Sequence, residues 1–391
     1  MSKLQELIKE LCPDGVEFRK LGEVCEFING FAFKSSLFKD EGLPIIRITN
    51  INGISIDLSD VKFFDSRDYK SNLQSFSVSF GDILIAMSGA TTGKIGYYDN
   101  EDIAYLNQRV GKFVPNVNVL NNRYLFHFLL SKTSELYIMA GGGAQPNLSS
   151  NKLMNELYIP LPPLEIQNEI VRILDTFTSH TAELQAELQA RKEQYEYYRN
   201  KLLTFDENDE RVKWMMLGKV CNMKRGKRLT TKDLSPEGEY PVYHGGIEAI
   251  GKYTAYNREG NSVMIINVGA SAGTIGFCNT KFWSSDGCFC FEHNSVINQK
   301  YLYFVLQTLE PILKSKVRKA GIPTLDNKVV ERLIIPILPI PEQERIVSIL
   351  DKFESLVNDL SEGLPAEIAA VQEQYEYYRN KLLTFRRMEK H

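Results

Sequence analysis

The chain has 391 residues, of which 43% are hydrophobic and 24% are charged, and its formal net charge is −3. This length allows two to three domains with their own cores. No run of about 18 uncharged apolar residues occurs, and the N-terminus lacks the apolar segment of a secretion signal, so neither a membrane span nor export is expected.

The first part of the chain is expected to be a block of short strands that follows a short helix at residues 4–11. Residues 43–50 and 82–87 follow glycines and are rich in β-branched side chains, which is typical of strands entered from a turn. Residues 261–266 repeat this pattern later in the chain. The apolar segments 124–130 and 301–306 fit either a helix or a buried strand, and periodicity leaves the choice open.

Two long helices are expected, at residues 165–205 and, with a break near Gly363 and Pro365, at the C-terminus. At about 1.5 Å per residue the first would be about 60 Å long. Apolar and aromatic residues recur at helical spacing and form one stripe on each. The stripe residues that we expect to pair the helices or to dock a partner are Ile170, Phe177, Leu184, Leu188, Tyr195, Tyr198, Leu202, Ile346, Leu350, Phe353, Tyr375, Tyr378 and Leu382.

Each stripe needs a surface that covers it. The two helices could pair with one another as an antiparallel coiled coil, or each could pack on its own globular block. The coiled coil is favoured because few single-domain surfaces are long enough for such a helix.

These helices contain an internal duplication. Residues 193–205 read EQYEYYRNKLLTF, and residues 373–385 read the same. The flanking segments match as well, from the start of each block to the proline runs at 159–163 and 335–339. The chain is therefore a pseudo-two-fold repeat of the α+β class, with four parts: a strand-rich domain at 1–160, a helix at 161–208, a second strand-rich domain at 209–338 and a helix at 339–391.

Charge is unevenly distributed between the parts. Residues 211–334 contain 18 Lys and Arg against 10 Asp and Glu, which gives +8, whereas the helical segment 161–210 contains 5 against 11, which gives −6. A locally basic block is what binding to a polyanion requires.

No catalytic or metal-binding motif is present. The sequence contains no GxxxxGK[ST], GxSxG or HExxH pattern, and the histidines and the six cysteines show no ligand spacing. The glycine-rich segment 89–96 is too short for a phosphate-binding loop, and its repeat at 269–276 has Thr274 where the first copy has Lys94. A turn between strands is the better interpretation. Scattered cysteines also indicate a reducing, cytoplasmic compartment.

The whole chain resembles the specificity subunit of a type I restriction-modification system. The resemblance is carried by the two-fold repeat, by LPPLEIQNEIVRILDTF and IPEQERIVSILDKF, by the duplicated QYEYYRNKLLTF, and by the block openings LGEVCEFINGFAFKSS and LGKVCNMKRGKRLTTKDL. It implies two target recognition domains that each bind half of a split, asymmetric site in double-stranded DNA. The paired helices would set the gap between the half-sites and dock two modification subunits.

The resemblance also implies that this chain is not an enzyme and carries no cofactor of its own. S-adenosylmethionine, ATP and Mg²⁺ would belong to the modification subunits and to the restriction subunits that join them, in a bacterial or archaeal cytoplasm. No membrane partner is implied. Two alternatives stay open: an orphan scaffold or antirestriction-like protein that binds the modification subunit without reading DNA, and an enzyme with an unrecognised site.

Candidate DNA contacts follow from the residue types that suit phosphates and base edges. In the second block they are Lys224, Arg225, Lys227, Arg228, Lys232, His244, Lys316, Arg318 and Lys319. In the first block the segment that matches the 224–232 cluster is 29–36, and the candidates are Lys34, Ser35, Ser36, Arg47, Asn50, Gln108 and Arg109.

The two helices differ in the length of one segment. Sixteen positions separate Phe177 from Glu193, but twenty separate Phe353 from Glu373, and residues 182–190 read AELQAELQA with a period of four. Four residues correspond to about 6 Å of helix. We therefore expect a change of four residues to alter the gap between half-sites by less than two base pairs.

Overall fold

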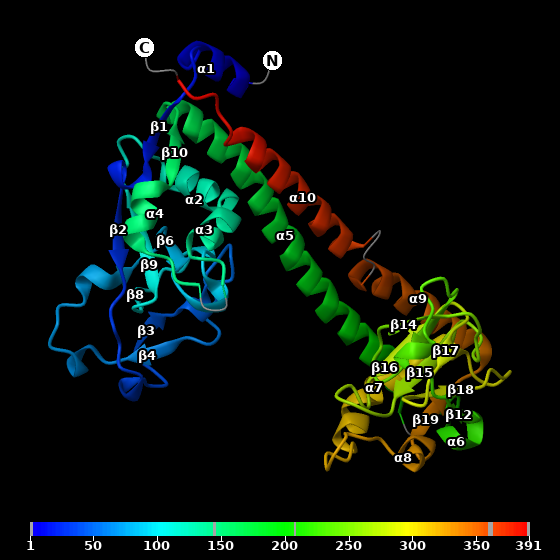
Figure 1. Ribbon diagram of the computed structural model, residues 1–391. Helices are drawn as coiled ribbons and strands as arrows, with labels where there is room; N and C mark the ends of the chain where they lie inside the picture. The colour runs from blue at the N-terminus through cyan, green and yellow to red at the C-terminus, as the bar shows by residue number, and fades with distance from the viewer. Residues whose placement is uncertain (1–2, 144–145, 207–208, 359–362, 389–391) are drawn as a thin grey trace. The chain divides into compact units, whose positions relative to one another are not determined.

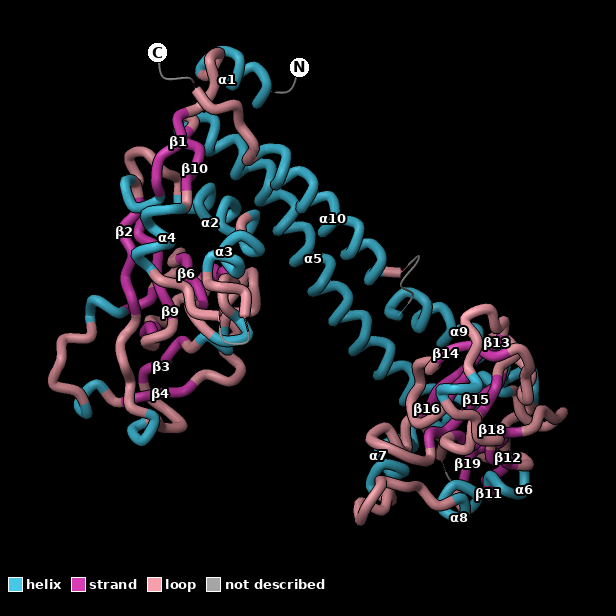
Figure 2. Tube along the Cα trace, in the orientation of Figure 1, coloured by secondary structure: helices cyan, strands magenta, loops and turns pink. Residues whose placement is uncertain are grey.

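The computed structural model describes residues 3–143, 146–206, 209–358 and 363–388. The chain forms two compact units. Unit 1 comprises Met1–Glu183 and Ile368–His391, and unit 2 comprises Leu184–Glu367. Figures 1 and 2 show the helices and strands of both. Among the described residues, no helix is both long and apolar enough to cross a membrane.

Unit 1 begins with helix α1 (Lys3–Leu11) and contains three small sheets. An antiparallel pair joins β1 (Glu17–Lys20) to β10 (Tyr158–Leu161). A four-stranded antiparallel sheet has the order β2 (Cys25–Asn29), β9 (Val110–Pro115), β6 (Ile83–Ala86), β7 (Ile95–Tyr97). A second four-stranded sheet has the order β4 (Lys62–Phe64), β3 (Leu43–Ile46), β8 (Ala104–Leu106), β5 (Ser77–Val78), with β3 and β8 parallel. Helices α2 (Asn122–Ser131), α3 (Thr133–Met139) and α4 (Ser150–Glu156) complete the block.

Unit 2 repeats this plan. An antiparallel pair joins β11 (Lys213–Met216) to β19 (Ile334–Ile337). The larger sheet has the order β12 (Met223–Arg225), β18 (Cys288–Phe291), β15 (Ser262–Ile266), β16 (Ile275–Cys278). The smaller has the order β14 (Gly251–Tyr253), β13 (Tyr240–Tyr243), β17 (Trp283–Ser284), with β13 and β17 parallel. Its helices are α6 (Leu217–Val220), α7 (Gln299–Ser315) and α8 (Asn327–Glu331).

The two ambiguous apolar segments are helices, α2 and α7. Both start at an asparagine cap: Asn121 accepts a hydrogen bond from the Tyr124 main-chain N–H, and Asn298 accepts from the Lys300 and Tyr301 N–H groups. A strand prediction for the end of segment 43–50 was wrong. β3 ends at Ile46, and Ile48–Asn50 forms a 3₁₀ turn in which the Asn50 side chain accepts from the Arg47 N–H.

The central helix α5 is continuous from Leu164 to Leu203. The C-terminal repeat consists instead of α9 (Ile340–Asn358) and α10 (Leu364–Leu382). Pro365 lies in the first turn of α10, where its missing N–H costs no helical hydrogen bond. The four-residue length difference between the repeats falls partly on residues 359–362, outside the described residues.

Each unit's core contains the beginning of one repeat helix and the end of another. In unit 1, Ile170 of α5 and Tyr375 of α10 belong to the same core. In unit 2, Ile346 of α9 and Tyr195 of α5 do. The segments of α5 and α10 in unit 1 lie side by side (Figure 1). The two alternatives for the apolar stripe therefore both occur. Some turns of each repeat helix pack on the globular block, and other turns pack on the other helix.

One buried glutamine fixes the start of each repeat helix. In unit 1, Gln167 accepts from the Asn121 N–H and donates to the carbonyls of Val119 and Pro162, at 2.8–2.9 Å. In unit 2, Gln343 makes the same three bonds, to Asn298, Val296 and Leu338. Both side chains are fully buried, so the same three hydrogen bonds satisfy the amide of each glutamine at the start of each repeat helix.

Candidate nucleic-acid interface and helix pair

The lysine and arginine candidates of unit 2 come from two segments far apart in the chain, and all of these candidates are exposed. The first segment is the end of β12 and the loop after it, and the second follows α7. These residues are Lys224, Arg225, Lys227, Arg228, Lys232, Lys316, Arg318 and Lys319.

Arg225 of the first segment lies at a hollow of about 400 Å³ in unit 2, and the second segment is tied to the same hollow through the backbone pairing of Arg318 with Thr324. Arg225 and Thr324 both line it. Thr324 in turn exchanges two main-chain hydrogen bonds with Arg318, at 2.9 and 3.1 Å. A polyanion above this hollow would therefore meet cations from both segments.

Asp286 connects His244 to the same region. The Arg225 Nε donates to the Asp286 main-chain oxygen at 3.0 Å, and the His244 Nδ1 lies 3.3 Å from the Asp286 carboxylate. Lys224 points elsewhere and pairs with Glu292 at 3.4 Å. Of the nine candidates in unit 2, Arg225, His244 and Arg318 are thus linked around the hollow by these contacts.

In unit 1, the candidates divide into exposed and structural residues. Lys34, Ser35 and Ser36 lie on an exposed 3₁₀ turn, and Gln108 and Arg109 are exposed between β8 and β9. Phe31, just after β2, bridges to Asn107, so the segment after β2 lies beside the loop of Gln108 and Arg109.

Two unit 1 candidates are occupied by the protein itself. The Arg47 Nη2 donates to Asp60, at 2.8 Å to its carbonyl and 3.3 Å to its carboxylate. Asn50 is 3% exposed, accepts from the Arg47 N–H and donates to the carbonyls of Asp57 and Asp60. The structure therefore corrects the expectation for Asn50: its amide holds a loop and is not free to contact a base.

The helix-pair residues meet in matched aromatic stacks. In unit 1, Phe177 stacks on Tyr378 with ring centroids 5.5 Å apart. In unit 2, Phe353 stacks on Tyr198 at the same distance. The other predicted pairing residues, Ile170, Leu184, Tyr195, Ile346, Leu350 and Tyr375, are buried, while Leu188, Leu202 and Leu382 are partly buried.

The thirteen identical residues include a buried face and an exposed face. Tyr195 and Tyr375 are buried, and Arg199 and Arg379 lie over their rings at 5.3 and 5.1 Å. Seven identical positions are exposed in both copies: 193, 196, 197, 198, 200, 201 and 204, with counterparts 180 residues later. Tyr197 and Tyr377 are each 59% exposed. Packing explains the identity of the buried residues and of Tyr198 and Tyr378, which stack on Phe353 and Phe177, but not that of the other six exposed positions.

Sequence reasoning missed the residues that tie each block to a helix. In unit 1, Arg123 pairs with Asp175 and lies over the Tyr97 ring at 4.5 Å. In unit 2, Lys300 pairs with Asp351 at 3.4 Å and Glu354 at 2.6 Å. Alignment of the two halves through Tyr124 and Tyr301 would have placed Arg123 opposite Lys300, so the repeat held the signal.

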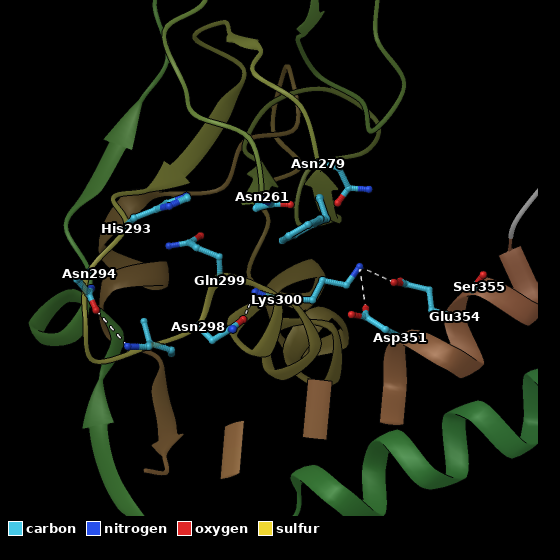
Figure 3. A pocket seen from close by; sticks show the side chains of 12 residues that line it. Asn261, Asn279, His293, Asn294, Asn298, Gln299, Lys300, Asp351, Glu354 and Ser355 are labelled. Carbon is cyan, nitrogen blue, oxygen red and sulfur yellow. Dashed lines mark hydrogen bonds and ion pairs between the residues drawn. The ribbon is translucent and has the colours of Figure 1, made fainter. Parts of the chain in front are cut away.

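A larger hollow of about 790 Å³ opens beside Lys300 in unit 2 (Figure 3). Asn261, Asn279, His293 and Asn294 line its other wall. The Lys300 ammonium is neutralised by two carboxylates and lies 4.5 Å from the Phe277 ring centre, so this group anchors α7 to α9. Among the described residues, no group of three or more His, Cys, Asp or Glu side chains could hold a metal ion.

Comparison with known proteins also divides the chain into two similar parts. The family model described as "Type I restriction modification DNA specificity domain" matches residues 13–194 and 210–370. A putative type I restriction enzyme specificity subunit of Haemophilus influenzae is 32% identical over 95% of this chain and 96% of its own. The EcoR124I/EcoR124II specificity subunit of Escherichia coli is 32% identical over 67% of this chain and 70% of its own.

Solved structures share the fold at low sequence identity. The type I restriction-modification S subunit from M. genitalium is 18% identical with a TM-score of 0.64, covering 94% of this chain and 96% of that one. A chain from a study of complex assembly in the type I R-M system is 20% identical with a TM-score of 0.57, covering 95% and 98%. With two matched domains, a two-fold repeat and a relative 32% identical that aligns along 96% of its length, this chain belongs to the family of type I restriction-modification specificity subunits.

Proposed function

We propose that this chain is the DNA-reading subunit of a type I restriction-modification complex, in which each unit reads one half of a bipartite, asymmetric site. The observation that carries the proposal is the internal contrast between the two units. They share one fold, yet the exposed residues after their first sheet strands differ: Lys34, Ser35 and Ser36 in one, Lys227, Arg228 and Lys232 in the other. Two readers of different half-sites need this combination.

Basic charge supports DNA as the ligand of unit 2. Arg225 lines the hollow and Arg318 pairs with Thr324 beside it, and phosphate contacts by Lys and Arg supply most of the affinity of proteins for DNA. The first block is near neutral, so the affinity of unit 1 is expected to depend more on hydrogen bonds and on partner subunits.

We propose further that two modification subunits dock on the repeated helix ends. Apart from Tyr198 and Tyr378, which stack on Phe353 and Phe177, six exposed positions of the repeat are identical in the two copies although helix pairing does not require it. A shared partner that binds both copies accounts for this, because each copy must present the same surface to it. Tyr197 and Tyr377 are suitable anchors, since large aromatic side chains contribute strongly at interfaces.

Catalysis is assigned to the partners. The family is that of non-catalytic recognition subunits, and we propose that S-adenosylmethionine, ATP and Mg²⁺ are held by the modification and restriction subunits, in the cytoplasm. This chain would then contribute the choice of DNA sequence and the positions of two methyltransferases.

The decisive experiment is to express the chain with its modification subunit and to map N6-methyladenine across a genome. Two different short motifs separated by a fixed, non-specific gap are expected. A single continuous palindrome would contradict two different recognition domains. Binding of the modification subunit without any sequence-specific methylation would instead indicate a scaffold that does not read DNA.

A further inference from the structure

The two units make the same turn at the end of β2 in unit 1 and of β12 in unit 2, which are equivalent edge strands of four-stranded sheets. In unit 1, β2 ends at Asn29, and the N–H groups of Gly30 and Phe31 donate to Val110 and Leu106. In unit 2, β12 ends at Arg225, and the N–H groups of Gly226 and Lys227 donate to Cys288 and Ser284. The residue before the glycine therefore occupies an equivalent place in both units.

Both glycines are required by close backbone contact. A Cβ atom at Gly30 would lie 2.0 Å from the Asn107 carbonyl oxygen, and one at Gly226 would lie 2.0 Å from that of Ser285. Each turn is thus pressed against the loop that enters the neighbouring strand. This contact fixes the position of Asn29 and Arg225 before any ligand binds.

A hollow faces this position in each unit. It measures about 740 Å³ in unit 1 and about 400 Å³ in unit 2. The second wall is α4 in unit 1 and α8 in unit 2, helices that are capped by Ser149 and Asp326. Four lining positions correspond between the units: Phe27 with Met223, Asn29 with Arg225, Ser150 with Asn327, and Met154 with Glu331.

The polar side chains at the matched position are available for a ligand. The Asn29 Nδ2 reaches the Ser150 Oγ only at 3.4 Å, and the residue is exposed. Arg225 uses its Nε to bond Asp286, which orients the guanidinium. Among the described residues, its two terminal nitrogens have no hydrogen-bond partner.

A buried acceptor in the unit 2 hollow also lacks a donor. Asn267 is 2% exposed, lines the hollow, and its Oδ1 accepts no hydrogen bond within the described part of the chain. Buried polar atoms are normally paired, and because this oxygen has almost no exposed surface, an ordered water is the donor that fits it.

We propose that Asn29 and Arg225 are matched base-reading residues, one for each half-site. Asn29 would bond an adenine through N6 and N7, and Arg225 would bond a guanine through O6 and N7, because these are the bidentate pairs that each side chain forms best in the major groove. The two hollows accept the edge of the base pair. The inference rests on the proposed function and assigns one position of each half-site to one residue.

The test is an exchange of the two side chains in the full complex with its modification subunit. In Asn29→Arg, methylome mapping is expected to show adenine replaced by guanine at one position of the first half-site, with the second half-site and the gap unchanged. Arg225→Asn is expected to give the reverse change in the second half-site only. Methylation of the original sites should fall at least tenfold in each variant.

Conservative and neighbouring substitutions separate base reading from folding and charge. Arg225→Lys keeps the positive charge but loses the bidentate geometry of the guanidinium. This variant should still methylate DNA but should accept more than one base at one position of the second half-site. Lys224→Asn, on the other face of the same strand and paired with Glu292 in the wild type, should leave both recognition motifs unchanged. Active variants Asn29→Arg and Arg225→Lys that keep the original motifs would overturn the inference. A wild-type complex without a bipartite motif would overturn the proposed function instead.

Discussion

The ring of Phe177 stacks on that of Tyr378 with a 22° angle between the planes, which joins α5 to α10 within unit 1. Phe353 and Tyr198 make the equivalent stack in unit 2, at 24°. Phe177→Ala should therefore loosen the C-terminal helix, at a cost of about 1–3 kcal/mol in the free energy of unfolding of unit 1. Hydrogen exchange should show faster exchange along α10. Phe353→Ala is the matched variant and should leave α10 protected; equal loss of protection from both would contradict a local role.

The buried glutamines give a second, larger effect. Gln167→Met preserves most of the side-chain volume but leaves the Asn121 N–H and the carbonyls of Val119 and Pro162 without a partner. Each unsatisfied buried group costs about 1–3 kcal/mol, so we expect a loss of at least 2 kcal/mol in urea unfolding of the complete chain. The exposed Gln189→Met on the same helix is the control and should change stability by less than 0.5 kcal/mol, as exposed sites do. A neutral Gln167→Met would show that water or a shift of the backbone satisfies these groups.

Much of the architecture was predictable because it is repeated. The proline runs, the helix stripe and the thirteen identical residues predict two domains and two helical segments from the sequence alone. The candidate site was harder. Asn50 is a residue type that suits adenine, yet its loop uses every polar atom of the side chain. No local pattern distinguishes these two uses, because the partners Asp57 and Asp60 depend on the path of the loop.

The contribution of position 29 was equally hidden in the sequence. Asn29 becomes notable only when the backbone shows that Gly30 and Gly226 contact equivalent carbonyls. The link between Arg225 and Arg318 likewise depends on Thr324, which brings together segments about 90 residues apart. Pairing between strands distant in the sequence creates both the glycine contacts and the link between Arg225 and Arg318. Composition and periodicity do not predict such pairing.

Acid is expected to destabilise unit 1 through a buried histidine. Burial lowers the pKa of His127 below its ordinary 6.5, an effect that the hydrogen bond to Asp175 opposes and the charges of Arg123 and Arg379 reinforce. The neutral ring donates from Nε2 to Asp175 and accepts at Nδ1 from the Tyr375 hydroxyl, at 2.8 and 2.9 Å. The unfolded chain gains a proton near pH 6.5, and the folded chain gains it only at a lower pH. Stability is therefore lost as the pH falls below about 6.5, by up to about 1.4 kcal/mol per pH unit.

This prediction can be measured by replacing His127 with the residue at the equivalent position of the second repeat. Phe304 occupies the equivalent position in α7, so His127→Phe should reduce the difference in unfolding free energy between pH 7.5 and pH 5.5. The variant will also be less stable at pH 7.5, because Tyr375 loses its acceptor. His180→Gln, at a side chain that is 49% exposed, is the control and should leave the pH dependence in place. An unchanged pH dependence in His127→Phe would assign the effect to another group.

The identical exposed surfaces lead to a prediction about stoichiometry. Tyr197→Ala and Tyr377→Ala should each leave the fold intact, since both side chains are 59% exposed. Each single variant should lose one of two modification subunits in native mass spectrometry, and the double variant should lose both. Affinity at the altered copy should fall at least tenfold, as expected for an aromatic anchor at an interface. Tyr137→Ala, an exposed tyrosine of unit 1 outside the repeat, is the control. Full occupancy in the double variant would rule out this surface as the docking site.

The continuity of α5 makes the gap between half-sites open to engineering. A second copy of residues 182–185 (AELQ) inserted in register adds about 6 Å of helix and turns the following residues by about 40° beyond one full turn. The stripe that includes Leu184 and Tyr198 thus stays near its original face, and both half-sites should persist with a gap longer by less than two base pairs. An insertion of two residues turns the second half of α5 by about 200°, which carries Tyr198 away from its side of the helix. That variant should lose bipartite methylation altogether. Methylome sequencing of both variants distinguishes a helical spacer from a passive linker, because a passive linker would tolerate two residues as well as four.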